Sequence, residues 1–168
     1  RESFNDQLIF GPSYSLTYSP KRRAGFASYF VGASLELSGN ILYSAYSLSD
    51  RETNEDGQYE VVRVPFAQYA RSQFDTRMYL DVGDYTQLVF RQNLGVGIPY
   101  LNSSSLPFAK QFFVGGASSL RGFPFRSVGP GSYVNTENTD DSFFDQTGDI
   151  MLEWNAESRF DLGGYLKG

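Results

Sequence analysis

Residues 112–133 read FFVGGASSLRGFPFRSVGPGSY, with Leu120-Arg121-Gly122-Phe123 at the centre. Glycines alternate here with arginines and aromatic residues, a composition typical of neither a regular helix nor a regular strand. The segments on both sides alternate apolar and polar residues. The stretch is therefore predicted to be a long, ordered loop between two strands, and loops of this kind commonly carry function.

Composition limits the chemistry open to this chain. Its 168 residues are 40% hydrophobic and 17% aromatic, with no Cys, no His and a formal net charge of -5. The lack of Cys and His excludes disulfides, zinc-thiolate sites and Ser-His-Asp catalysis within the chain. No catalytic residue, metal or cofactor is predicted, and the negative charge argues against binding nucleic acid. The mean hydropathy of -0.36 and the absence of a long apolar run exclude a transmembrane helix.

Five segments have the period of two that marks a β-strand. They are residues 7–18, 26–37, 69–83, 86–98 and 150–162. In the third segment Arg71, Asp75 and Arg77 fall on the face opposite Phe74 and Met78. Such charges cost several kcal/mol each if left unpaired in a dry core, so a soluble β-sandwich is disfavoured. One face is predicted to line a watery lumen and the other to contact lipid.

The connections between these segments alternate between short and long. Residues 19–25, 83–85 and 163–164 are short, whereas residues 39–59 and 99–149 are long, as in outer-membrane barrels. Residues 41–48 fit either a short helix or an extension of a strand. The acidic tract at 135–149 lacks the spacing of a calcium-binding loop, and it reads as solvated. Gly95 and Gly97, on the inner face of the fourth strand, leave room for a group to enter the lumen.

The central motif resembles the signature loop of the BamA/TamA family of outer-membrane assembly proteins. In that motif Val, Leu or Ile precedes Arg-Gly, and Phe or Tyr follows. The setting adds to the resemblance: Gly115-Gly116 precede the motif, SVGPG follows it at residues 127–131, and Gly148 opens a strand that contains NAESRF. The order of these segments looks most like the bacteroidete branch of the family, and the resemblance covers about residues 59–168.

The resemblance implies an all-β fold, an antiparallel transmembrane β-barrel of about sixteen strands. Residues 1–168 would be a partial C-terminal outer-membrane barrel domain, with five strands, the start of a sixth and the motif loop at about 99–149. Because about eight strands are the usual minimum for closing a barrel, we expect the chain to be part of a larger sheet.

The resemblance also implies how the loop is held. In the family the loop folds back into the barrel, and acidic residues on the lumen wall hold its arginine. Spacing from Gly148 puts the first acidic partner of Arg121 on Glu157, which the alternation places on the inner face, with Glu153 as the alternative. Bidentate pairing would favour arginine over lysine in a partly desolvated lumen.

The other candidate residues belong to the loop itself. Gly122 is expected to permit a close turn, and Phe123 and Phe125 to pack the tip of the loop against the wall. Arg126 is expected to make a second contact in the lumen. The supporting positions are Gly115, Gly116, Arg126, Gly129, Pro130 and Gly131.

The resemblance implies a non-enzymatic factor that inserts or exports other proteins at the bacterial outer membrane, without a cofactor. Its partners would be the lipid bilayer, unfolded outer-membrane or secreted proteins, and accessory lipoproteins or an inner-membrane protein. Two alternatives remain open. The barrel is also compatible with the membrane carrier of a patatin-like phospholipase, although no GxSxG motif occurs here, and with a passive pore or adhesin.

Overall fold

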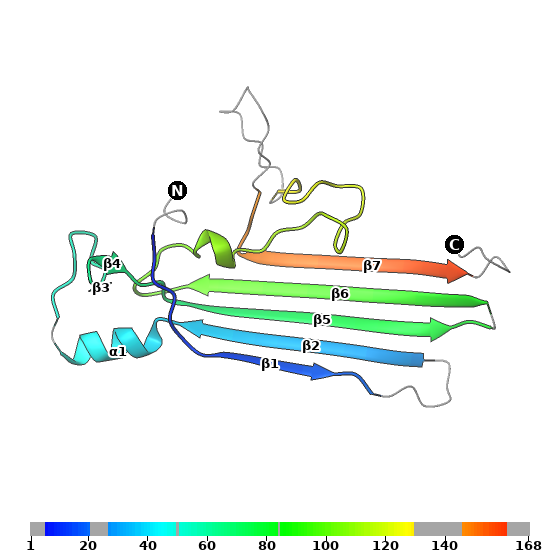
Figure 1. Ribbon diagram of the computed structural model, residues 1–168, viewed down its shortest axis with the longest axis horizontal. Coiled ribbons are helices and arrows are strands. Elements are labelled where there is room, and N and C mark those ends of the chain that lie inside the picture. Colours follow the sequence, from blue (N-terminus) through cyan, green and yellow to red (C-terminus); the bar gives the residue numbers. More distant parts are fainter. Residues whose placement is uncertain (1–5, 21–26, 50, 84, 130–145, 161–168) are drawn as a thin grey trace, which may run out of the picture.

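The structure, a computed structural model, describes residues 6–20, 27–49, 51–83, 85–129 and 146–160. One antiparallel sheet dominates it, with the strand order β1-β2-β5-β6-β7 (Figure 1). Its strands are β1 (Ser13–Tyr18), β2 (Ala27–Ser38), β5 (Tyr69–Asp81), β6 (Thr86–Pro99) and β7 (Ile150–Phe160). The all-β fold expected from the sequence is confirmed, and the sheet is open, with β1 and β7 as its edges.

The long connections lie together at one end of the sheet (Figure 1). They contain helix α1 (Asn40–Leu48), the small hairpin of β3 (Glu60–Val61) and β4 (Val64–Pro65), and the 3-10 helix η2 (Phe108–Lys110). At the other end the connection from β5 to β6 is tight, since the Val82 amide donates to the Thr86 carbonyl at 2.7 Å. Gly83 takes a φ of +85° there, a conformation that glycine adopts without strain.

Residues 41–48, for which the sequence allowed a short helix or an extension of a strand, lie in helix α1. Gly39 precedes the helix in the left-handed region at φ +78°, and its carbonyl accepts the first helical hydrogen bond from Tyr43. Tyr43 and Tyr46 then pack edge to face against Tyr59, with ring centroids 5.4 and 6.1 Å apart. The aromatic partner comes from a segment farther along the chain, so local periodicity does not contain this information.

The first strand is shorter than its sequence pattern. We expected a strand over residues 7–18, but β1 begins at Ser13. Residues before it run close to two other segments: Leu8 exchanges backbone hydrogen bonds with residues 65 and 67, and the Gly39 amide donates to Phe10. A Cβ at Gly11 would overlap the Leu37 carbonyl, and the Leu37 amide donates to the Pro12 carbonyl at 3.0 Å, so the segment before β1 still lies along the end of β2.

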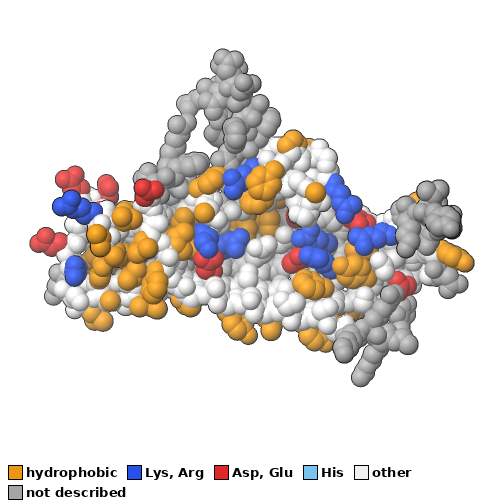
Figure 2. Space-filling model, in the orientation of Figure 1, with side chains coloured by type: hydrophobic (Ala, Val, Ile, Leu, Met, Phe, Trp, Pro, Cys, Tyr) orange, Lys and Arg blue, Asp and Glu red, His pale blue; other side chains and the backbone are white. Residues whose placement is uncertain are grey.

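The sheet has two chemically different faces. On one face the large apolar side chains stay exposed, among them Tyr14 (67%), Leu152 (67%) and Trp154 (72%). On the other, charged and amide side chains of β5 and β6 bond to one another, and those of β7 bond within the strand. Figure 2 shows basic and acidic groups gathered across this side. The register aligns Asp75 with Asn93 and Asn93 with Glu153, which confirms the predicted alternation. This polar face of β5, β6 and β7 is called the wall below.

A small core lies where the long connections meet the sheet. Phe66, Ala67, Tyr69 and Leu106 are at most 1% exposed. Asn102 fastens this region, since its side chain bonds the Tyr59 amide at 2.6 Å and the Phe66 carbonyl at 2.9 Å. In the described part of the chain, no helix has the length and apolar character needed to cross a membrane.

Candidate functional site: the loop on the polar face

Residues 100–129 leave the end of β6 and lie along the wall before the chain enters β7 (Figure 1). The two ends of the loop are joined, because Phe112 and Gly148 exchange backbone hydrogen bonds of 2.8 Å in both directions. A further hydrogen bond of 2.7 Å runs from the Gly97 amide to the Asp149 carbonyl. The loop is therefore continuous with the sheet at its base.

Glycines in β6 make space for the loop. The Phe112 ring occupies the position that a Cβ on Gly95 would take, and Leu106 lies where a Cβ on Gly97 would lie, with its Cδ1 atom 2.7 Å away. Phe112 is 4% exposed and Leu106 is fully buried. The expectation that Gly95 and Gly97 leave room on the inner face is thus confirmed, and the groups that enter come from this same chain.

A second set of contacts fixes the part of the loop that leads from β6 toward the tip. The Lys110 ammonium lies 2.6 Å from the Glu36 carboxylate on β2, and the Tyr69 hydroxyl donates to the same carboxylate at 2.7 Å. Arg71 donates through Nε to the Lys110 carbonyl at 2.9 Å, and its guanidinium stacks 4.1 Å from the Phe112 ring centroid. Because these groups compensate one another, charge is held on the polar side of β2 and β5 without an isolated buried ion.

The tip of the loop, residues 117–122, carries the central motif to the wall. The Arg121 guanidinium lies 3.0 Å from Oε1 of Glu157 on β7. The same carboxylate accepts two hydrogen bonds from Arg159, at 3.1 and 2.9 Å. The Arg121 side chain is 69% exposed and that of Glu157 33%. Glu157 thus stands beside Arg121 as the sequence predicted, but the contact is open to solvent.

Two serines add contacts that the sequence reasoning missed. Ser119 donates to Glu153 at 2.8 Å, so this carboxylate, the alternative partner of Arg121, binds a different residue of the tip. The Ser118 carbonyl accepts from Arg91 at 2.6 Å, and Arg91 also bonds Asp75. Serines carry no periodic or charge signal, so nothing in the sequence marks them as contacts.

The backbone of the loop uses its glycines as expected. Gly115, Gly116 and Gly122 all have a positive φ, between 90° and 106°, where other residues are strained. Gly129 lies so close to the Gln146 side chain that a Cβ would overlap it. Pro130 and Gly131, the remaining supporting positions, lie outside the described residues.

Two predicted roles in the loop differ from what the structure shows. Phe123 and Phe125 are 55% and 57% exposed, so they do not pack the tip against the wall. Phe125 lies against Phe113 of the same loop, with centroids 4.4 Å apart. Arg126 lies over the rings of three phenylalanines of the loop, and its expected second contact in the lumen stays a prediction. Phe125 therefore packs against a ring of its own loop.

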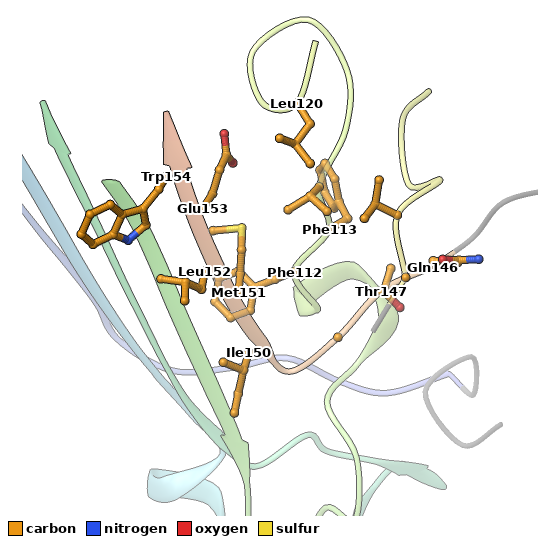
Figure 3. A pocket seen from close by; sticks show the side chains of 14 residues that line it. Phe112, Phe113, Leu120, Gln146, Thr147, Ile150, Met151, Leu152, Glu153 and Trp154 are labelled. Atoms are coloured by element: carbon orange, nitrogen blue, oxygen red, sulfur yellow. The ribbon is translucent and has the colours of Figure 1, made fainter. Parts of the chain in front are cut away.

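A cavity of about 310 Å³ separates the loop from β7. Figure 3 shows Phe112, Met151 and Leu120 around it, while Trp154 points away on the apolar face. Among the described residues, no group of three or more His, Cys, Asp or Glu is placed to hold a metal ion. The chemistry available at this site is hydrogen bonding, ion pairing and ring stacking, which can position a loop.

Comparison with known proteins gives one match. Residues 55–167, more than half of the chain, match the model of the Omp85 superfamily domain. The searches of curated proteins and of solved structures gave no match. The matched range contains β5, β6, β7 and the whole motif loop.

Proposed function

The chain belongs to the Omp85 superfamily, and from this premise we propose that it is part of the barrel of a BamA/TamA-type factor, which inserts or exports other proteins at the bacterial outer membrane. Membership supports an outer-membrane location and a general role in protein assembly or translocation. The finer proposal adds that residues 1–168 are a partial barrel domain and that the motif loop is its functional element.

The observation that carries this proposal is the seating of the loop tip on the wall. Arg121 reaches Glu157, Ser119 reaches Glu153, and the Ser118 carbonyl reaches Arg91. These contacts come from adjacent positions of the tip and end on β6 and β7. A passive connection between two strands needs no such set of contacts, and loops placed on a rigid scaffold are where function concentrates.

The role proposed for Arg121 is positional. An exposed ion pair contributes only about 0.2–1 kcal/mol, so the Arg121–Glu157 contact cannot hold the fold together by itself. Together with the contacts of Ser119 and Lys110, it selects one loop position among those open to a glycine-rich segment. The loop in turn holds β6 and β7 together across the face of the sheet.

The proposed mechanism involves no covalent step and no cofactor, so the chain is not an enzyme in this proposal. The apolar face contacts the lipid bilayer, whereas the wall and the loop face the aqueous lumen. Unfolded outer-membrane or secreted proteins are the proposed substrates, with accessory lipoproteins or an inner-membrane protein as further partners. The phospholipase carrier and the passive pore or adhesin are not favoured by the family match.

The test is the pair of variants Arg121→Ala and Glu157→Ala in the intact protein. Each is expected to lower the level of folded outer-membrane proteins, and the double variant should be no worse than the single ones, because both remove one contact. Arg159→Ala is the matched control, since it removes the other cationic partner of Glu157 and leaves the loop contact in place. Normal outer-membrane protein levels in both single variants would contradict the proposal.

A further inference from the structure

The loop has a neck at which its two arms meet. Val114 and Val128 form an isolated antiparallel bridge, and the Gly116 amide donates to the Phe123 carbonyl at 2.9 Å. The tip lies beyond this point, so the spacing of the two arms decides where Arg121 is presented. A group that closes the neck would control the tip without touching the wall.

Arg126 lies at the neck, over three aromatic rings. Its guanidinium carbon is 4.5 Å from the ring centroid of Phe108, 5.0 Å from that of Phe113 and 5.2 Å from that of Phe125. Phe108 belongs to η2, Phe113 to the arm that leads from η2 to the tip, and Phe125 to the arm that returns from the tip. One cation therefore connects three segments, at distances where attraction to a ring face is effective.

The backbone of Arg126 is also unusual. Its φ of +56° lies in the left-handed region, where a residue with a side chain is uncommon. The Arg126 carbonyl accepts a hydrogen bond of 3.0 Å from the Gln146 amide, which brings the chain back toward β7. Strained residues persist where their surroundings hold them in place, and here the three rings and this hydrogen bond do so.

We propose that Arg126 is a positioning residue of the motif loop: its stacking on Phe108, Phe113 and Phe125 closes the neck and thereby keeps Arg121 within reach of Glu157. The inference deepens the proposed function and rests on it for its biological meaning. It gives a positioning role to Arg126, which lies outside the four-residue motif at 120–123. The exposed positions of Phe113 and Phe125 are explained as well, because both rings contact the Arg126 guanidinium.

The test measures the position of the loop directly. The chain has no Cys, so nitroxide labels can be placed at Ala117→Cys on the tip and Ser158→Cys on β7 of the intact protein, after replacement of any other cysteine. Pulsed electron spin resonance then gives the distance distribution between them. With Arg126 present we expect one narrow distance. Arg126→Met, which keeps an unbranched stem but removes the guanidinium and its charge, should raise the displaced population about tenfold.

Two further variants isolate the cause. Arg126→Lys retains a cation and should restore most of the narrow distribution, whereas Phe125→Leu removes one ring and should broaden it. Arg63→Met is the matched control, since Arg63 also has a positive φ, of 65°, but lies at the tip of the β3–β4 hairpin. If Arg126→Met fails to fold, Phe125→Leu, which changes a 57% exposed side chain, provides the same test.

The outcomes separate this inference from the proposed function. An unchanged distance in Arg126→Met, or in Phe125→Leu if the first variant does not fold, overturns the positioning role, and so does equal broadening in Arg63→Met. Neither result affects the assembly test of Arg121 and Glu157. Conversely, a displaced loop with normal assembly supports the positioning role and contradicts the function proposed for the loop.

Discussion

At the scale of single residues, the fit between loop and sheet depends on two glycines of β6, which have no side chain. Phe112 can lie flat on β6 because Gly95 has no Cβ, and Leu106 uses Gly97 in the same way. Each apolar side chain is thereby almost fully buried on a face that is largely polar. Burying a side chain of this size contributes about 1.5–3 kcal/mol, more than the exposed ion pair at the tip.

Gly95→Val is therefore expected to displace Phe112 and to destabilise the loop by about 1–3 kcal/mol, the usual cost of overpacking. The measurement is the fluorescence or protease sensitivity of the loop in the intact protein under increasing denaturant. Gly148→Ala is the control, because a Cβ there meets only ordinary van der Waals contact at 3.7 Å. Equal loop stability in Gly95→Val and Gly148→Ala would show that the close fit has no energetic role.

At the scale of elements, β5 and β6 place two like charges opposite each other. Arg77 and Arg91 are partners in the register, an arrangement that by itself is destabilising. Asp75 compensates the repulsion between the two arginines, since its carboxylate binds Arg77 at 2.7 Å and Arg91 at 3.2 Å. Arg91 then continues to the Ser118 carbonyl, so this shared carboxylate also supports the tip of the loop.

Asp75→Asn should leave the two arginines facing each other and lower the stability of the β5–β6 pair by about 1–3 kcal/mol, less than for a fully buried pair because these side chains are partly exposed. The expected signature is a stability that increases with salt, since screening weakens the repulsion. Adding Arg77→Gln to Asp75→Asn should restore most of the loss. A double variant as unstable as Asp75→Asn would contradict this account.

At the scale of the whole molecule, the sheet separates an apolar surface from a polar one. Along β7, Leu152 and Trp154 are exposed on one side, whereas Met151 and Glu153 are buried under the loop on the other. In water such a surface would promote aggregation, but in a bilayer it is the stable arrangement. The structure and the family match together support this placement of the two faces.

Leu152→Arg is expected to cost about 2–4 kcal/mol of folding free energy in lipid vesicles, because it puts a charge into hydrocarbon near the middle of a membrane. Asn155→Arg is the matched variant on the same strand but on the wall, and it should cost much less. Urea titration of the protein folded into vesicles measures both. Equal costs for the two variants would contradict the assignment of the apolar face to lipid.

The amino-acid sequence by itself determined the five strands and their faces, apart from the start of the first strand. Strand alternation is a local property with a period of two, so each face could be assigned residue by residue, as in β5 and β7. The glycines of β6 likewise pointed to positions that the structure brings under the loop, and the resemblance of the motif to a known family added the pairing of Arg121 with Glu157.

The tertiary structure decided what those positions meet. Helix α1 forms where Tyr59 is available to Tyr43 and Tyr46, and Arg126 lies over rings of its own loop. The contacts of Ser118 and Ser119 likewise depend on how the tip lies on β6 and β7. These pairings join residues distant in sequence or compete with one another at similar energies. Local patterns cannot rank them, because only the folded chain fixes which groups come within contact distance.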